Sequence, residues 1–270
     1  MKKLSMVGIL MLVVVCLGAT VLAKPSVVAT HAVLGEFAQI VGGDVIEVTT
    51  IIPSGFCPAF YDLCPSDVAA VSRATMVLYS GIEPWMDSLL DAVGATARVV
   101  LLTGEWTTPD TAADKVDAIA ASLSELLPTD AAVFAANAAA YKEELTLLAS
   151  ALRQRADALF VGDIPVISMA WQEPFVTWLG FDVAATYGIP ANLSLQDLGE
   201  LVAAGAAAGA VAVIDNLQSG VNFGAKLARE IGAVHVVLSN FPGAMPGTAT
   251  VLDLYAQNAK ALFSAIEPSP

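Results

Sequence analysis

The chain has 270 residues, 56% of them hydrophobic and 14% charged, a composition that excludes an intrinsically disordered protein. Its formal net charge of −14 argues against electrostatic binding to nucleic acid or to an anionic membrane surface. The two histidines and three cysteines of the whole chain exclude zinc-finger arrays, c-type haem motifs and disulfide-dense scaffolds.

The N-terminal segment has the pattern of an export signal. Lys2 and Lys3 precede an apolar run that extends to Ala23, and the run ends in the small-residue pattern of a cleavage site. We expect residues 1–23 to be a cleaved signal peptide, with an uncleaved N-terminal anchor as the alternative, because about 20 apolar residues also suffice to cross a bilayer. The rest of the chain is then expected to be exported, to the periplasm or the cell surface.

Short runs of β-branched residues alternate with segments of helical period along the rest of the chain, which predicts an α/β fold with parallel sheets. The first set of predicted strands comprises Ser26–Thr30, Ile46–Ile52, Met76–Ser80 and Arg98–Leu102. The second set comprises Pro165–Met169, Asp182–Tyr187, Ala210–Asp215 and Ala233–Ser239, with helices at Ser194–Gly209, Gly220–Gly232 and Val251–Ile266. The two sets predict two Rossmann-like lobes, over residues 24–127 and 161–270.

One long helix is predicted between the two lobes, within residues 128–160. The segment from Thr129 to Leu159 is rich in Ala, Leu and Glu and contains no Gly or Pro. A helix of that length extends roughly 45 Å at 1.5 Å per residue, enough to act as a rigid connector between the lobes. Two shorter helices broken near Ala149 and Ser150 are the alternative.

Ligands of open parallel sheets bind beyond the carboxyl ends of the strands, so the residues at these ends are the first candidates for a site. The polar or sulfur-containing residues that the sequence places there are His31, Cys57, Glu83, Glu105, Met169, Asp215 and Asn240. The chain lacks the glycine-rich dinucleotide motif, the P-loop motif and the nucleophile-elbow motif. This combination favours a binding protein over an enzyme.

Several segments resemble the cluster A-I metal-binding proteins of ABC transporters, the zinc and manganese uptake group. The clearest likeness is IIPSGFCPAFYDLCPSDVAAVS, residues 51–72. Four further segments resemble the family: residues 27–48, SGIEPWMDSLL at 80–90, FAANAAAYKEELTLL at 134–148 and DLGELVAAG at 197–205. The likeness covers essentially the whole expected mature chain in order. It implies two α/β lobes joined by one long helix, in agreement with the elements above.

The resemblance also shows that the family's metal ligands are largely replaced. The family usually binds its metal through three imidazoles and one carboxylate. At the positions that correspond to the three histidines this chain has Ala59, Gly104 and Met169, and Asp215 corresponds to the carboxylate. Because one carboxylate does not hold a divalent metal tightly, an ordinary tetrahedral zinc site is not expected.

Three interpretations of the site remain open. In the first, the metal site is rebuilt from other donors, namely His31, Glu105, Glu173 and Asp215, with the sulfurs of Met169, Cys57 and Cys64. In the second, the cleft binds a small polar ligand or a metal chelate through Trp171, Gln172, Asn216, Gln218 and Asn240. In the third, the protein is a degenerate paralogue that acts as an adhesin or accessory surface protein.

Several candidates also have structural explanations. Cys57 and Cys64 are expected to meet an oxidising compartment, which favours a disulfide worth on the order of 2 kcal/mol. His31 follows the first strand, where a neutral imidazole serves equally well as a helix cap. Core packing is the default for Met169 and for His235, which lies within a strand.

The resemblance implies an extracytoplasmic solute-binding protein of an ABC importer, with a membrane permease and ATPase as its partners and a monomer as its state. The ligand is then expected to be a transition metal ion, zinc or manganese by resemblance, or a metal-containing or small polar ligand. Capture between the lobes, limited by the long helix, is expected to place Asp215 at the ligand. An enzyme that uses Glu105, Glu173 and Asp215 as acid and base groups is the alternative from another class.

Overall fold

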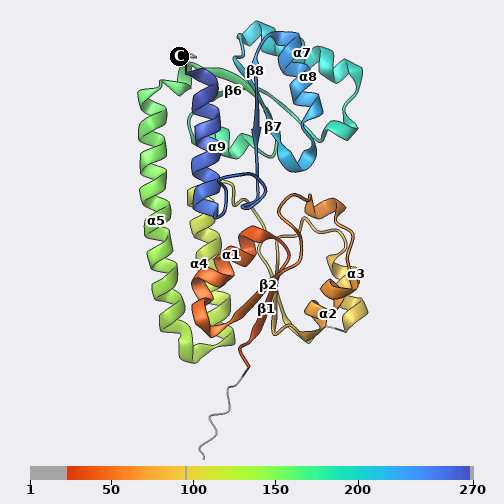
Figure 1. Ribbon diagram of the computed structural model, residues 1–270, viewed down its shortest axis with the longest axis vertical. Helices are drawn as coiled ribbons and strands as arrows, with labels where there is room; N and C mark the ends of the chain where they lie inside the picture. The colour runs from red at the N-terminus through yellow and green to blue at the C-terminus, as the bar shows by residue number, and fades with distance from the viewer. Residues whose placement is uncertain (1–22, 95, 268–270) are drawn as a thin grey trace, which may run out of the picture.

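The structure, a computed structural model, describes residues 23–94 and 96–267 (Figure 1). The expected signal segment therefore lies outside the described residues, except for Ala23. Within the described ranges, no helix combines the length and the apolar character needed to cross a membrane.

The N-terminal lobe contains a four-stranded parallel sheet with the order β2-β1-β3-β4. Its strands are β1 (Ser26–Ala29), β2 (Glu47–Thr50), β3 (Met76–Tyr79) and β4 (Arg98–Leu101). Its helices are α1 (Ala32–Gly42), α2 (Pro65–Arg73), α3 (Met86–Val93) and α4 (Pro109–Leu126). Alternate residues of β1 point to opposite faces, so Val27 packs in the core with α1 and α4, whereas Val28 packs in the core with α2 and α3.

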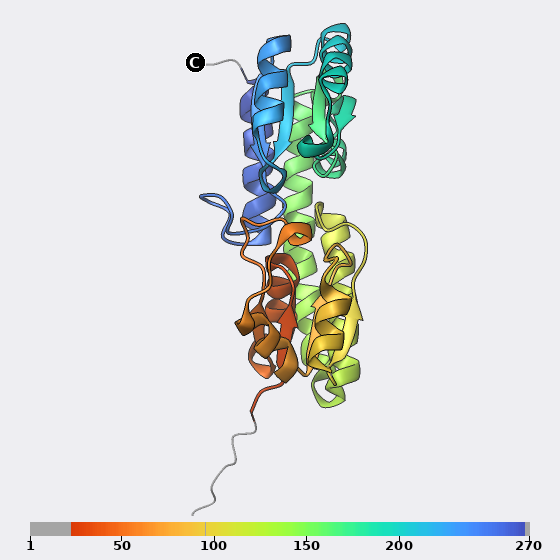
Figure 2. The ribbon, with the colours of Figure 1, turned by 90° about the vertical axis from the view of Figure 1, so that its right-hand side faces the viewer.

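The C-terminal lobe repeats this arrangement with the strand order β6-β5-β7-β8, again all parallel. Its strands are β5 (Pro165–Met169), β6 (Asp182–Tyr187), β7 (Ala212–Asn216) and β8 (Val234–Leu238). Its helices are α6 (Glu173–Trp178), α7 (Leu195–Ala208), α8 (Asn222–Ile231) and α9 (Val251–Ile266). Helices α7 and α8 cover one face of the sheet, and α9 covers the other (Figure 1). Figure 2 shows the two lobes one above the other along the long axis of the molecule.

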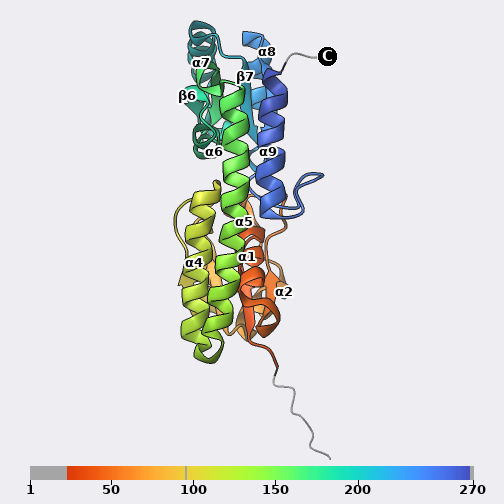
Figure 3. The same cartoon turned by 90° about the vertical axis from the view of Figure 1, so that its left-hand side faces the viewer.

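The lobes are joined by α5 (Ala131–Ala158), a single 28-residue helix that runs beside both of them (Figure 3). The helix is unbroken at Ala149 and Ser150, so the alternative of two shorter helices is wrong. At 1.5 Å per residue it is about 42 Å long. Its buried residues form one stripe at spacings of three, four and seven, which packs on α1 and α4 and then on α9. They are Phe134, Ala138, Tyr141, Leu145, Ala149 and Ala156.

The predicted strands and the three predicted C-terminal helices are all present, with differences confined to their ends. β5, β6 and α9 have the predicted bounds, whereas β2 is shorter than the predicted Ile46–Ile52. Short 3₁₀ helices account for several loop segments: Gly43–Val45, Pro58–Phe60, Pro128–Asp130, Val161–Asp163, Pro190–Asn192 and Leu217–Ser219. The three residues directly before α5, Pro128–Asp130, thus form one turn of 3₁₀ helix rather than the start of the long helix.

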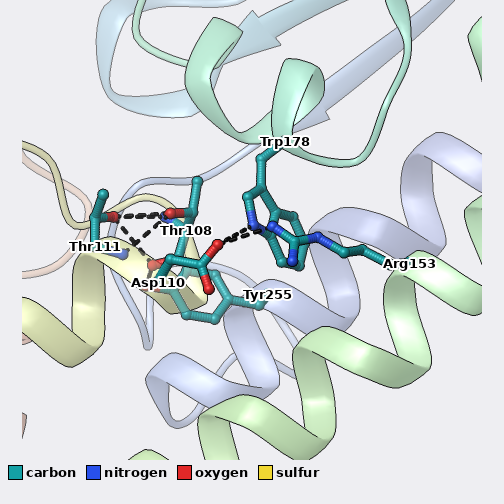
Figure 4. Close-up of polar contacts among 6 residues, drawn as sticks. All are labelled: Thr108, Asp110, Thr111, Arg153, Trp178 and Tyr255. Carbon is teal, nitrogen blue, oxygen red and sulfur yellow. Dashed lines mark hydrogen bonds and ion pairs between the residues drawn. The ribbon is translucent and has the colours of Figure 1, made fainter.

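A polar contact ties the two lobes together where α5 passes from one to the other (Figure 4). Asp110 Oδ2, at the start of α4, accepts a hydrogen bond from Trp178 Nε1 of α6 and from Arg153 Nη2 of α5, each at 2.8 Å. The Arg153 guanidinium also lies 4.5 Å from the centre of the Trp178 ring. The Tyr255 hydroxyl of α9 donates to the backbone oxygen of Trp106 in the N-terminal lobe. These contacts fix how the strand ends of the two sheets face each other.

Candidate functional site

The carboxyl ends of the two sheets meet at one cavity of about 30 Å³. In the N-terminal sheet β2 lies on one side of β1 and β3 on the other, and in the C-terminal sheet β6 and β7 flank β5 in the same way. The topological switch points therefore lie between β1 and β3 and between β5 and β7, and open parallel sheets bind ligands at such points. From the N-terminal lobe the cavity is lined by Cys57, Pro58, Ala59, Ile82 and Trp106. From the C-terminal lobe it is lined by Trp171, Asn216, Gln218, Ser219, Asn240 and Phe241.

Hydrogen bonds across the cleft hold the cavity in this form. Gln218 Nε2 donates to the backbone oxygen of Ser54, in the N-terminal lobe, at 3.1 Å, and to Ser239 Oγ at 2.9 Å. Trp106 Nε1 donates to the backbone oxygen of Asn240 at 3.2 Å. The cleft is therefore closed by contacts that involve its own lining residues, and a ligand that enters must compete with them or use the space that they leave.

Four of the five residues predicted for a polar cleft line this cavity: Trp171, Asn216, Gln218 and Asn240. Trp171 is 38% exposed and reaches solvent, whereas Asn216 is almost fully buried. The fifth residue, Gln172, lies behind the lining and donates from Nε2 to Asn240 Oδ1 at 2.7 Å. The structure thus brings this predicted group together, with Gln172 as support for Asn240.

Several lining residues were not predicted as ligand contacts. Trp106 and Phe241 stack with ring centres 5.9 Å apart and form an aromatic wall. Ser219 follows Asn216 in the turn after β7, and Ile82 follows β3. The position of Phe241 directly after Asn240 was an available signal. Ala59 was marked only by the family resemblance, as the position of a replaced histidine, and Ile82 has no side chain that marks a site in a sequence.

Asp215 does not line the cavity, contrary to the prediction that it is the main ligand contact. Its buried carboxylate accepts from the Tyr187 hydroxyl at 2.5 Å on Oδ1 and lies 2.7 Å from His235 Nε2 on Oδ2. Helix α8 covers the carboxylate so closely that a Cβ at Gly224 would lie 2.3 Å from Oδ2. Burial and the Asp215 charge raise the pKa of Tyr187, which keeps the phenol a donor. Asp215 is therefore a structural group beneath α8.

His31 is also buried behind the cavity and does not line it. Its ring stacks near Trp106, with centres 4.8 Å apart, and its Nε2 lies 3.2 Å from Ser80 Oγ. Because the Ser80 hydroxyl donates to Glu83 at 3.1 Å, the imidazole is the donor in that contact, and Nδ1 is left as a buried acceptor without a partner. Burial, aided by the charge of Lys115, lowers the pKa of His31 to about 3. His31 precedes α1 but makes no side-chain cap.

The other predicted metal donors are dispersed. Met169 is fully buried at the end of β5, in the apolar core with α7 and α8, and its sulfur lies 3.2 Å from the Trp171 backbone nitrogen. Glu105 is exposed and bonds to the Thr107 hydroxyl, and Glu173 is exposed in the first turn of α6. Glu105, Glu173 and Asp215 are thus not assembled at the cavity as acid and base groups.

Cys57 and Cys64 are both free thiols, so the expected disulfide is not formed. Cys57 lines the cavity, whereas Cys64 is exposed at the start of α2, where its backbone nitrogen donates to Asp67 Oδ2 at 2.8 Å. A proline-bounded 3₁₀ turn at Pro58–Phe60 separates the two cysteines. The spacing of seven residues in the sequence gave no sign that one thiol would line the cavity and the other would face solvent.

The residues of the cleft do not form a site for a bare divalent metal. In the part of the chain that the structure describes, no group of three or more His, Cys, Asp or Glu side chains could hold a metal ion. Cys57 is the only such residue type in the cavity lining. Tight binding of zinc needs at least three such ligands, so the rebuilt metal site inferred from the sequence is not assembled here.

A wider groove of about 550 Å³ also lies between the lobes, on the side of α1 and α9. Glu36 of α1 lines it and accepts from the Val251 backbone nitrogen, the first of α9, at 2.8 and 3.0 Å. Burial raises the pKa of Glu36 to about 7, against the hydrogen bond from Val251, which favours the carboxylate. Glu36 therefore links the lobes through the N-terminus of a helix.

Comparisons with known proteins establish the class to which this fold and cleft belong. Residues 27–265 match the family described as "Zinc-uptake complex component A periplasmic". Because the match extends over most of the chain, the protein belongs to this family of periplasmic metal-uptake components.

Among curated proteins, the chain is 28% identical over 183 residues to the metal ABC transporter substrate-binding lipoprotein SsaB of Streptococcus sanguinis, covering 55% of this chain and 59% of SsaB. It is 26% identical over 152 residues to the iron-binding protein YfeA of Yersinia pestis, covering 49% of each. The chain thus matches only about half to three-fifths of the length of these relatives.

Solved structures show the same fold. The periplasmic zinc-binding protein TroA of Treponema pallidum has a TM-score of 0.78 at 20% identity, covering 91% of this chain and all of TroA. The manganese-bound periplasmic metal-binding protein of Candidatus Liberibacter asiaticus has a TM-score of 0.80 at 16% identity, covering 90% of this chain and all of that chain. At these identities the likeness establishes the architecture of two lobes and one long helix.

Proposed function

We propose that the protein is the extracytoplasmic substrate-binding component of an ABC importer, which captures its cargo between the lobes and delivers it to a membrane permease and ATPase. One observation carries the proposal: the carboxyl ends of the central strands of both sheets, β1 and β3 in one lobe and β5 and β7 in the other, meet at a cavity that is lined from both lobes. Family membership and the relatives named as substrate-binding lipoproteins support this role.

The same arrangement supports binding without catalysis. The lining consists of aromatic rings, aliphatic side chains, amides, one hydroxyl and one thiol. The carboxylates Glu105, Glu173 and Asp215 do not face the cavity together, so it contains no acid and base pair of the kind that turnover would need. The protein releases its cargo chemically unchanged.

Capture involves limited movement of the lobes. A single continuous α5 packs on both of them, and the contact of Asp110 with Trp178 and Arg153 joins them beside that helix. Opening must therefore act by a small rotation at the cleft side, where Gln218 and Trp106 form the closing hydrogen bonds. The proposed working state is a monomer.

The family favours a transition metal as cargo, since relatives are named for manganese and iron and solved neighbours for zinc and manganese. Zinc and manganese are therefore the first ions to test. The cleft itself offers amides and aromatic rings, which suit a metal-containing or small polar ligand better than a bare ion.

The test is stoichiometric binding by protein purified from its own source. Native mass spectrometry should detect one bound ligand per chain, and thermal unfolding should show that the recovered ligand raises the melting temperature. Trp171→Ala, at the mouth of the cavity, should weaken binding, whereas Leu195→Ala, an exposed apolar position on α7, should not. Release of a chemically altered product would contradict the receptor role.

A further inference from the structure

The side-chain amides that line the cavity between the lobes have defined orientations, and the family resemblance does not predict them. The lining contributes three side-chain amides, those of Asn216, Gln218 and Asn240, and the Ser219 hydroxyl. An amide presents an acceptor oxygen on one side and donor hydrogens on the other. Which side remains free decides which ligand chemistry the cavity accepts.

The oxygen of Asn216 is occupied. Asn216 Oδ1 accepts from the Ser219 backbone nitrogen and from the Ser219 hydroxyl, each at 3.1 Å. Because a backbone N–H only donates, this contact fixes the orientation of the amide. Asn216 Nδ2 is then buried without a hydrogen-bond partner, in a residue that is 1% exposed. A buried donor left unpaired costs free energy unless a ligand or water satisfies it.

The other two amide oxygens are occupied as well. Gln218 Oε1 accepts from the Asn240 backbone nitrogen at 3.2 Å, which fixes the orientation of Gln218 in the same way. Asn240 Oδ1 accepts from Gln172 Nε2 at 2.7 Å. The amide nitrogen of Gln218 donates to Ser54 and Ser239, so the side-chain amides that keep free donor hydrogens at the cavity are those of Asn216 and Asn240.

Free donors and occupied acceptors favour a ligand with an acceptor atom. A bare cation needs several oxygen, nitrogen or sulfur ligands, whereas each amide oxygen of this lining already accepts a hydrogen bond from the protein and Cys57 supplies a single thiol. No Lys or Arg side chain lines the cavity, so a full negative charge would also be buried without a counter-ion. An uncharged oxygen acceptor satisfies the donors at the lowest cost of desolvation.

We propose that the cavity binds the uncharged carbonyl-type oxygen of its cargo, held by the amide donors of Asn216 and Asn240 against the rings of Trp106, Trp171 and Phe241. The volume of about 30 Å³ accepts one such group, and the remainder of the cargo extends past the exposed edge of Trp171. A free organic solute or the organic ligand around a metal can supply this oxygen. The proposal rests on the receptor role and names the chemistry that the receptor recognises.

The test compares three probes on the full chain: zinc or manganese chloride, N-methylacetamide, and the neutral tris(acetohydroxamato)iron(III) complex. The readout is the ¹⁵N–¹H spectrum of the side-chain amides together with quenching of tryptophan fluorescence. We expect N-methylacetamide to shift the Asn216 amide resonances, or the paramagnetic iron(III) complex to broaden them, with an effect that saturates. Saturation by N-methylacetamide assigns an organic solute, and saturation by the iron complex alone assigns a metal chelate.

Asn216→Asp removes the donor while keeping the acceptor for Ser219, and it should weaken the saturating probe at least tenfold. Asn222→Asp makes the same change at an exposed position outside the cavity and should have no effect. If the Asn216 variant does not fold, the amide spectrum of the native chain decides alone.

The outcomes separate this proposal from the receptor role. Saturable binding of zinc or manganese alone, with unshifted Asn216 resonances, would overturn the carbonyl ligand and leave the receptor intact. Binding by neither carbonyl-bearing probe would also overturn it. Binding of a carbonyl probe that is then chemically converted would support the cavity chemistry and end the receptor role.

Discussion

The buried neutral histidine gives the sharpest prediction about stability. Burial between Trp106 and Phe241 lowers the pKa of His31 from an ordinary 6.5 to about 3. The unfolded chain therefore takes up a proton at this residue near pH 6.5, while the folded chain does not. The contribution of His31 to stability is full at neutral pH and is lost as the pH falls below 6.5 towards 3.

The magnitude follows from the shift. Each pH unit within the window corresponds to about 1.4 kcal/mol, so acidification from pH 7.5 to 5 should remove about 2 kcal/mol through His31. His31→Gln keeps a donor for Ser80 and does not titrate. We therefore expect the free energy of unfolding of the native chain to fall by about 2 kcal/mol more than that of the variant over this range.

The assay is urea unfolding of both proteins at a series of pH values, with the imidazole resonances followed by NMR. The chain has two histidines, so the variant assigns the signal directly. The native His31 resonance should show a neutral ring protonated on Nε2 down to pH 4. Parallel stability curves for the two proteins between pH 7.5 and 5 would refute the reasoning.

Three further predictions concern other buried or reactive groups. Burial raises the pKa of Glu36 from 4.5 to about 7, so its contribution to stability is present below pH 4.5 and is lost as the pH rises through 7. Glu36→Gln should remove this pH dependence from the free energy of unfolding. A variant with the same pH profile as the native chain would contradict the prediction. Gly224→Ala should lower the free energy of unfolding by about 1–3 kcal/mol, because the added Cβ meets the buried carboxylate of Asp215 beneath α8. Gly199→Ala, in open space on α7, should not destabilise the protein. Equal changes in the free energy of unfolding for the two variants would argue against close packing at Gly224. Alkylation under non-reducing conditions should modify Cys64 rapidly and the half-buried Cys57 more slowly, by peptide mass spectrometry, and protection of both from the reagent would instead indicate a disulfide.

The sequence predicted the architecture because its signals are local and repeated. β5 and β6 are short runs rich in β-branched residues, and α9 begins after Thr250, whose hydroxyl accepts from the Asp253 backbone nitrogen. The absence of Gly and Pro from the connector correctly predicted one long helix. The strand ends also placed the amides of Asn216, Gln218 and Asn240 at one cavity.

The site ligands were harder to predict because neighbouring residues of a strand point to opposite faces. Asp215 and Asn216 both end β7, but Asp215 faces α8 and Asn216 faces the cleft. A shift of one residue thus exchanges a structural carboxylate for a ligand-binding amide. Met169 illustrates the same limit at β5, since its side chain lies in the apolar core.

The contact of Tyr255 with Trp106 has a consequence for the order in which the molecule is assembled. It joins residues 149 positions apart, and the donor lies on α9, the last helix of the described residues. The first lobe can form its sheet and helices early in synthesis, but the backbone at Trp106 gains this partner only when the final helix has been made. Completion of the cleft therefore waits until α9 has been synthesised, and loss of α9 would remove the hydrogen bond that Tyr255 gives to the backbone of Trp106.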